Sequence, residues 1–211
     1  MSMSQAHAKS NLLIVLSAPS GAGKTTICNG LLAGDPSIVR AVTCTTRPPR
    51  PGERDGVDYH FLTPAAFERQ MAEGGFLEQA QVYGHRYGTL KREVLERLRQ
   101  AQDVLLNVDV QGAASIRALA QADAELGAAL VTVFLTPASV DVLAERLARR
   151  GQDPPGVVAR RLAEAREEIA VWREFDYLVV SSSVAEDLRR VRSILEAEKM
   201  RTRRVGWAPG A

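Results

Sequence analysis

A glycine-rich stretch near the start of the chain, from Ser17 to Thr26, limits the possible folds more than any other feature. It reads SAPSGAGKTT and directly follows the apolar run from Leu12 to Leu16. A short apolar run ended by Gly, Ser and Pro residues is typical of a buried parallel strand. A strand, a glycine-rich loop and a helix in this order place backbone N–H groups and a helix N-terminus around a phosphate. We therefore expect a parallel α/β sheet with a phosphate site at the end of its first strand.

The loop also contains the lysine and the hydroxyl that such a site uses. The Walker A pattern requires Gly, four residues, then Gly-Lys-Ser/Thr; here Gly23-Lys24-Thr25 is intact, and Ala18 stands at the first position. Lys24 is predicted to reach the outer phosphates of a nucleotide and Thr25 to meet Mg²⁺. The alternative is a glycine-rich turn with a solvated lysine, which the strand–loop–helix context disfavours. The predicted ATP-binding residues are Ser20, Gly21, Ala22, Gly23, Lys24, Thr25 and Thr26, with Thr25 as the metal residue.

Beyond this loop, short apolar runs alternate with amphipathic segments. Buried strands are expected at 104–108, 130–135 and 177–180, and helices at 24–33, 89–100, after Gln111, from Pro137 and at 184–195. Apolar strands that alternate with helices are typical of βαβ units and a parallel sheet. The predicted fold class is therefore α/β, a three-layer phosphate-loop fold with a parallel central sheet.

Two segments interrupt the alternation. Residues 35–89 are rich in Thr, Arg, Pro and Gly in their first half, and we interpret them as an inserted subdomain that binds a substrate. The helical pattern also breaks between Arg150 and Gly156, which predicts a small lid at about 150–160. The core then comprises 11–34 and 90–211. Residues 1–10 are expected to be a disordered lead, and the basic run from Arg201 to Arg204 a solvated helix end.

Composition excludes several classes of protein. The formal net charge is only +2. Nucleic-acid binders usually have a larger imbalance between basic and acidic residues, so no nucleic-acid partner is expected. Cys28 and Cys44 lack metal-ligand spacing and form no disulfide framework, which favours a reducing compartment. No run approaches the ~18 apolar residues of a membrane span. The sequence leaves the oligomeric state open, a homo-oligomer included.

Four further segments carry the functional signal. They read TCTTRPPRPGE from Thr43, GVDYHF from Gly56, FLE from Phe76 with YGHRYGT from Tyr83, and NVDVQG from Asn107. In this order, and together with the SAPSGAGK loop, they resemble the guanylate kinase family over nearly the whole chain. The segment from Thr43 is the most specific of them. The resemblance implies a cytoplasmic enzyme of purine nucleotide metabolism that transfers the γ-phosphoryl group of ATP to GMP or dGMP with Mg²⁺.

The residues at the matching positions suit GMP chemically. Paired guanidinium groups and hydroxyls bind a phosphomonoester well. Guanine presents two adjacent N–H donors that one carboxylate accepts, whereas adenine would leave that carboxylate unpaired in a dry pocket. The resemblance assigns Arg47, Arg50, Tyr59 and Tyr87 to the phosphate of GMP. It assigns Glu78 to the guanine donors, Thr43 and Thr89 to the guanine carbonyl, and Asp109 to the neighbourhood of the acceptor and the metal.

Each of these residues also has a purely structural interpretation. The two arginines could be solvated loop charges, the tyrosines packing residues and Glu78 an exposed strand carboxylate. Thr89 is also a plausible N-cap for the helix that follows it, and Asp109 for the helix near Gln111. For Asp109 the sequence leaves the two interpretations open.

The resemblance further implies that arginines surround the transferring phosphate. They would neutralise charge on its oxygens while the two nucleotides are held in line. The predicted catalytic residues are Lys24, Arg47, Arg146, Arg150 and Arg161. Three positions depart from the family pattern: Pro154-Pro155-Gly156 replaces a polar, acidic helix start, Ser181-Ser182-Ser183 replaces Asn-Asp-Asp, and Asn107 replaces an acid. They leave the lid kinetics and the adenine and ribose contacts open.

Other phosphate-loop proteins fit the sequence less well. A sugar-phosphate kinase would lack the set Thr43, Arg50, Tyr59 and Glu78. A non-enzymatic scaffold module usually has a degraded phosphate loop, and a GTPase switch would need an Asn-Lys-x-Asp segment, which this sequence does not contain.

Overall fold

The computed structural model describes residues 8–9, 11–82, 84–150 and 155–206. At its centre lies a five-stranded parallel sheet in the order β10-β9-β2-β8-β3. Its strands are β2 (Leu13–Ser17), β3 (Ile38–Arg40), β8 (Asp103–Asn107), β9 (Leu130–Pro137) and β10 (Tyr177–Ser181). The parallel α/β fold predicted from the sequence is confirmed, and the phosphate-loop strand β2 lies in the middle of the sheet.

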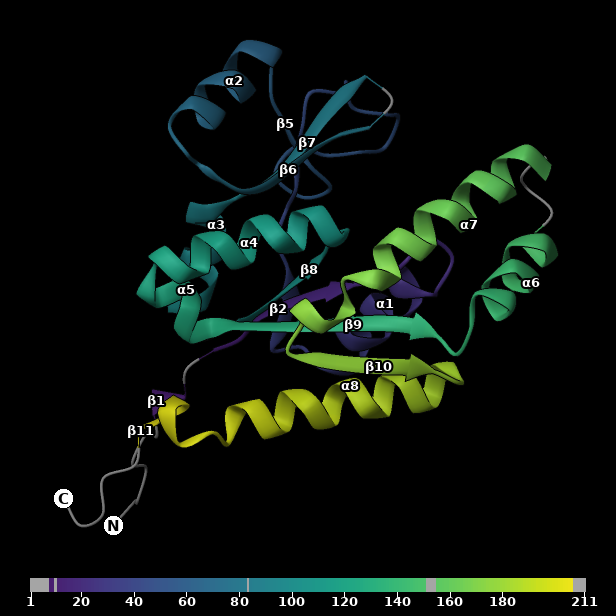
Figure 1. The fold of residues 1–211 in the computed structure, drawn as a ribbon. Helices are drawn as coiled ribbons and strands as arrows, with labels where there is room; N and C mark the ends of the chain where they lie inside the picture. Colours follow the sequence, from purple (N-terminus) through teal and green to yellow (C-terminus); the bar gives the residue numbers. More distant parts are fainter. Residues whose placement is uncertain (1–7, 10, 83, 151–154, 207–211) are drawn as a thin grey trace.

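Helices cover both faces of this sheet (Figure 1). Along β2, Ile14 and Leu16 belong to the apolar cluster on the face of α1 (Lys24–Gly34) and α8 (Val184–Lys199). Leu13 and Val15 belong to the cluster on the opposite face. That face is covered by α3 (Lys91–Arg99), α4 (Val110–Ala122) and α5 (Ala124–Ala129). Because side chains alternate along a strand and both faces are buried, the first four residues of β2 are all apolar.

A second sheet stands apart from the first at the upper side of Figure 1. Its four strands run in the order β5-β4-β7-β6, with bounds β4 (Cys44–Thr45), β5 (His60–Phe61), β6 (Phe76–Val82) and β7 (His85–Leu90). With α2 (Pro64–Ala72), it encloses its own small apolar cluster, in which the rings of Phe67 and Phe76 stack at 4.4 Å between centroids. This unit therefore has a core separate from that of the parallel sheet.

Two helices project from the end of the parallel sheet where β9 and β10 finish (Figure 1). They are α6 (Val140–Arg150) and α7 (Pro155–Ala170), which pack on each other through Leu143, Ala165, Val158 and Leu162. The 3₁₀ turn η1 (Trp172–Glu174) follows α7, and η2 (Thr202–Arg204) follows α8. Of the helices that the structure describes, none combines the length and apolarity needed to cross a membrane.

The structure corrects three expectations from the sequence, two about segments and one about burial. Residues 38–40, predicted to belong to the 35–89 insertion, form β3 and pair with β8 in the core sheet; three residues are too few to show a pattern. Ala8 and Lys9, predicted to be a disordered lead, form β1 (Ala8–Lys9) and pair with β11 (Val205–Gly206). Arg204, predicted to be solvated, is buried. Of the predicted lid at 150–160, positions 151–154 lie outside the described residues, and helix α7 begins at Pro155.

Candidate active site

The glycine-rich loop adopts the wrapped conformation that the sequence predicts. Gly21 and Gly23 have φ angles of 90° and 100°, in the left-handed region that glycine adopts without strain. Gly23 is also the N-cap of α1, so the loop ends directly at a helix N-terminus. The backbone at Ala18 lies outside the positive-φ region, which explains why alanine can replace the usual glycine there.

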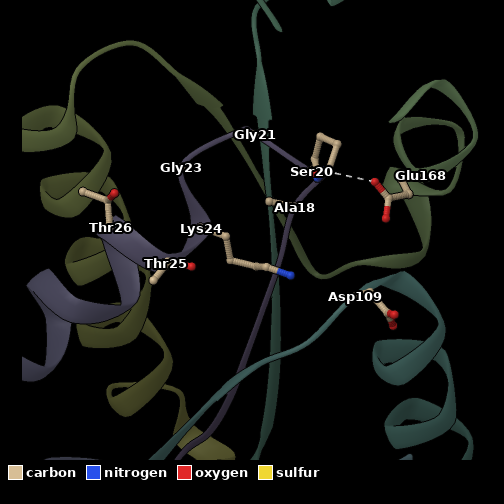
Figure 2. Close-up of a pocket in the computed structure, with 10 residues that line it drawn as sticks. Ala18, Ser20, Gly21, Gly23, Lys24, Thr25, Thr26, Asp109 and Glu168 are labelled. Carbon is tan, nitrogen blue, oxygen red and sulfur yellow. Dashed lines mark hydrogen bonds between the residues drawn. The ribbon is translucent and has the colours of Figure 1, made fainter. Parts of the chain in front are cut away.

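This loop lines a cavity of about 360 Å³ (Figure 2). Of the predicted ATP-binding residues, Ser20, Gly21, Gly23, Lys24, Thr25 and Thr26 line it, while Ala22 is buried behind the loop. The Lys24 ammonium donates a hydrogen bond to the Val108 carbonyl at 2.7 Å. Burial lowers the pKa of Lys24, while the carboxylates of Asp109 and Glu168 act in the opposite direction. The cavity thus combines backbone N–H groups, the Lys24 cation and the three hydroxyls of Ser20, Thr25 and Thr26, a set suited to phosphates.

Glu168 is a residue of this cavity that the sequence analysis missed. It lies on α7, and its carboxylate accepts a hydrogen bond from the Ser20 N–H at 3.2 Å (Figure 2). Burial raises the pKa of Glu168, which the Ser20 N–H and the Lys24 ammonium partly oppose. Its position seven residues after Arg161 is a signal that could have found it, because residues two turns apart share a helix face.

A second cavity, of about 240 Å³, lies where the carboxyl end of β8 faces the four-stranded sheet. Most of the predicted acceptor residues meet in it, although they come from four separate segments of the chain. The predicted residues that line it are Thr43, Tyr59, Glu78, Tyr87, Thr89 and Asp109. The lining also includes Arg40, Ala41, Ala80 and Asn107, which were not predicted as site residues.

Glu78 and Thr89 face each other across β6 and β7. The Thr89 hydroxyl donates a hydrogen bond to Glu78 Oε1 at 2.7 Å. The alternative that Thr89 caps the next helix is wrong, because the N-cap of α3 is Leu90. Burial raises the pKa of Glu78, and the bond from Thr89 partly opposes this. The carboxylate is therefore held half-buried inside the cavity and is not an exposed strand residue.

Arg47 and Arg50 lie on the segment that precedes this cavity but do not line it. Arg47 forms a bidentate ion pair with Glu53, with both N–O distances at 2.9 Å, and its guanidinium lies 5.3 Å from the centroid of the Tyr59 ring. The hydrogen bond to Glu53 raises the pKa of Arg47 further. Arg50 is exposed, and its backbone N–H donates to the same Glu53 carboxylate at 2.7 Å. The structure thus places Arg47 beside the acceptor tyrosines and Arg50 at the surface.

Asp109 lines both cavities. Its carboxylate accepts a hydrogen bond from the Gly112 N–H at 2.7 Å and is the N-cap of α4. The capping interpretation that the sequence left open is therefore correct. Asp109 can cap the helix and still face both cavities, because a carboxylate has more acceptor sites than one N–H uses.

The predicted lid arginines lie on the two projecting helices. Arg161 is half-buried on α7. Arg146 and Arg150 lie on α6, and their side chains fall outside the described residues. In the described parts of the chain, no group of three or more His, Cys, Asp or Glu side chains could hold a metal ion alone.

Comparison with known proteins identifies the family. The family model described as guanylate kinase matches residues 10–198. The chain belongs to the guanylate kinase family. The guanylate kinase of Symbiobacterium thermophilum is 47% identical over 93% of this chain and 90% of its own length, and that of Maricaulis maris is 42% identical over 93% and 87%.

A solved structure agrees with this. The crystal structure of guanylate kinase from Anaplasma phagocytophilum matches with a TM-score of 0.68 and 31% identity, over 93% of this chain and 90% of that one. Guanylate kinases transfer a phosphoryl group from ATP to GMP, so this chain is a nucleoside monophosphate kinase. The resemblance derived from the sequence is confirmed.

Proposed function

We propose that the cavity of the glycine-rich loop binds ATP, that the cavity of the four-stranded sheet binds GMP or dGMP, and that the γ-phosphoryl group passes between them beside Asp109. The observation that carries this assignment is the shared wall: two cavities with different chemistry meet at one residue. One offers backbone N–H groups, a lysine and hydroxyls, and the other a carboxylate, hydroxyls and phenols. The first set suits a polyphosphate and the second a guanine nucleotide.

In the acceptor cavity, Glu78 would accept from the two adjacent donors of guanine, and Thr43 and Thr89 would donate to its carbonyl. Tyr59, Tyr87, Arg47 and Arg50 would hold the phosphate of GMP. Arg47 is already positioned by Glu53 and the Tyr59 ring, so little side-chain freedom is lost when it binds a phosphate. Arg50 would have to turn inward from the surface.

In the donor cavity, Lys24 would neutralise the outer phosphates, while Arg146, Arg150 and Arg161 would reach the transferring group from the lid helices. The phosphate of GMP already carries the attacking oxygen, so alignment and charge neutralisation supply most of the catalysis. Closing of the lid would exclude water and suppress hydrolysis of ATP.

Mg²⁺ is the cofactor that this arrangement fits. It prefers oxygen ligands and usually binds through one or two protein groups together with substrate phosphates. The Thr25 hydroxyl faces the donor cavity beside Lys24, and Asp109 stands across it. Mg²⁺ bound there would supply positive charge to the phosphates. A cytoplasmic location is part of the proposal and is supported by two buried cysteines that are free thiols.

A substrate panel tests the proposal. Purified protein is assayed for ADP formation with ATP and GMP, dGMP, AMP or UMP, with Mg²⁺ and after its chelation. We expect turnover with the two guanine nucleotides, much slower turnover with AMP and UMP, and none without Mg²⁺. Equal rates with GMP and AMP would contradict the assignment of the acceptor cavity.

A further inference from the structure

The four-stranded sheet is joined to the core by two stretches of chain. The first leaves β3 at Ala41 and enters β4 at Cys44, and the second passes from β7 directly into α3 at Lys91. Each stretch carries a threonine of the acceptor cavity, Thr43 on the first and Thr89 at the end of the second. Their relative position therefore depends on how the two stretches are held together.

Glu93, in the first turn of α3, bonds to both sides of this junction. Its Oε1 accepts a hydrogen bond from the Val42 N–H at 2.8 Å and one from Arg97 Nε at 3.2 Å. Its Oε2 lies 2.9 Å from Nε2 of His60 on β5. The Glu93 side chain is only 13% exposed, so water competes weakly for these bonds.

These bonds connect the two threonines of the cavity by a short path. Val42 is the chain neighbour of Thr43, and the His60 N–H donates to the Thr43 carbonyl at 3.0 Å. Glu93 stands four residues after Thr89, on the helix that continues β7. One carboxylate therefore holds the Thr43 stretch, the β5 strand and the Thr89 stretch at the same point.

We propose that Glu93 is a positioning residue for base recognition, which fixes Thr43 relative to Thr89 and Glu78 without touching the nucleotide. The proposal rests on the function proposed above, because it takes these three residues as the contacts to guanine. Glu93 is absent from the lining of both nucleotide cavities, so its influence on the base would be indirect.

The substitution Glu93→Ala removes the three contacts of the Glu93 carboxylate, with Val42, His60 and Arg97. It leaves the Val42 N–H without its acceptor, which is costly for a half-buried donor. The Thr43 stretch then gains freedom relative to Thr89. Base reading depends on simultaneous contacts and should suffer, whereas ATP binds to another part of the molecule. Glu93→Gln keeps the Oε1 acceptor for Val42 and should retain more of the function. The matched control is Glu96→Ala. Glu96 lies three residues after Glu93 on the same helix, and its side chain is exposed.

The experiment measures kcat and KM for GMP and AMP, and KM for ATP, in the wild type and the three variants. For Glu93→Ala we expect the KM for GMP to rise about tenfold and the GMP/AMP ratio of kcat/KM to fall about tenfold, the scale that corresponds to about 1.4 kcal/mol. KM for ATP should stay within about twofold, the scale of a change at an independent site. Glu96→Ala should match the wild type.

An unchanged GMP/AMP ratio in Glu93→Ala would overturn the proposal, as would an equal rise in the KM for ATP, which would indicate general loosening of the protein. If Glu93→Ala does not fold, Glu93→Asp takes its place, because its carboxylate is one methylene shorter and does not reach the Val42 N–H from the same backbone position. Retention of the wild-type GMP/AMP ratio in Glu93→Asp would equally overturn the proposal. A wild type that does not prefer GMP would contradict the proposed function itself. Thr43→Ala with an unchanged ratio would contradict the assignment of Thr43.

Discussion

At the scale of single residues, Lys24 connects the phosphate loop to the wall between the two cavities. Its ammonium is bonded to the Val108 carbonyl, one residue before Asp109. A cation held at this point can interact with a phosphoryl group during its transfer as well as with the nucleotide that carries it. Lys24 is therefore expected to contribute more to kcat than to the binding of the acceptor.

We predict that Lys24→Ala lowers kcat by roughly 10²–10³, the range found when one preorganised donor is removed from an active site. GMP should still bind with an affinity close to that of the wild type, because its cavity is lined by other residues. A coupled ADP assay and calorimetry with GMP measure the two quantities. Lys91→Ala is the control, since Lys91 pairs with Asp123 at 2.7 Å and lines neither nucleotide cavity. Turnover near the wild-type rate would refute the role of Lys24.

Glu78→Gln should weaken guanine discrimination more than it weakens phosphate binding. Guanine recognition needs the ionised carboxylate, and burial raises the pKa of Glu78. The affinity for GMP should therefore fall as the pH drops through that raised pKa and recover as the pH rises. In Glu78→Gln this part of the pH dependence should disappear. Calorimetry with GMP over a pH series tests it, with the exposed Glu96→Gln as control; an unchanged base preference would defeat the assignment.

The Glu78 carboxyl also makes the free energy of unfolding depend on pH, in the direction opposite to its effect on GMP affinity. Its raised pKa means that the folded protein holds the proton more tightly than the unfolded chain does. The free energy of unfolding then falls as the pH rises from the ordinary glutamate pKa to the raised one. The amide of Glu78→Gln avoids this loss, so the variant should melt at the same temperature as the wild type or higher at neutral pH.

Sequence reasoning found residues that line the second cavity more readily than the residues that hold the loops around the two cavities. Glu78 and Thr89 belong to segments with a family signature, and the structure places them in one cavity. Glu168 and Glu93 act through backbone N–H groups that are 148 and 51 positions away in the chain. No local pattern marks such a contact, because a carboxylate on a helix looks the same in sequence whether it faces solvent or a distant loop.

At the scale of secondary structure elements, the β6–β7 pair depends on close packing at Gly88. A Cβ atom added there would lie 2.9 Å from Phe76 Cδ1 and 3.1 Å from the Glu78 carbonyl oxygen. Phe76 stacks on Phe67 in the small core, so it cannot move aside freely. The neighbours of Gly88 in β7 are Tyr87 and Thr89, which both line the acceptor cavity.

We predict that Gly88→Ala destabilises the protein by about 1–3 kcal/mol, the usual cost of overpacking a core, and raises the KM for GMP while that for ATP is unchanged. Thermal unfolding and steady-state kinetics measure both effects. Gly156→Ala makes the same chemical change in the first turn of α7, where a Cβ meets nothing within 4 Å, and should be neutral or slightly stabilising. Equal effects of the two substitutions would exclude the packing explanation.

Elements were predictable from sequence when they were long and apolar. The strands β2, β8, β9 and β10 and the helices α1 and α8 appeared close to their predicted positions. The short strands β3, β4 and β5 did not, because two or three residues show no periodicity and their pairing partners are distant in the chain. The sequence did not predict the strand β7 for another reason. Its residues His85–Leu90 are mostly polar or small, which suits the wall of a cavity but gives no apolar strand pattern.

At the scale of the whole molecule, a buried ion pair joins the turn η2 to helix α8 and the core sheet. The Arg204 and Glu198 side chains are 1% and 2% exposed, with 3.1 Å between Nη2 and Oε2. Arg204 also donates to the carbonyls of Ala128 and Leu130, where α5 ends and β9 begins. The Tyr177 hydroxyl of β10 donates to the same glutamate. The basic run thus joins α8 to the sheet, which its composition did not reveal.

Breaking this pair from one side should be costly. We predict that Arg204→Met destabilises the protein by about 3 kcal/mol, because it removes the buried arginine that pairs with the buried Glu198 carboxylate. Among the described residues, Glu198 then keeps only the exposed charged partners Arg201 at 3.2 Å and Arg203 at 3.8 Å. Replacing both residues by apolar ones, as in Arg204→Met with Glu198→Leu, should restore much of the loss. Chemical denaturation measures the three free energies. The control is Arg99→Met, whose side chain is 62% exposed and pairs with Glu125 at the surface; a loss of similar size in this control would contradict the account.

The wall at Asp109 has a consequence for inhibitor chemistry. Because the same aspartate borders both cavities, a single compound that joins guanosine to adenosine through a phosphate chain could occupy both at once. Such a compound loses its translational freedom only once, and the second nucleoside binds at a high effective concentration. Affinity would be highest at one length of the phosphate chain. That length would measure the distance over which the phosphoryl group is transferred.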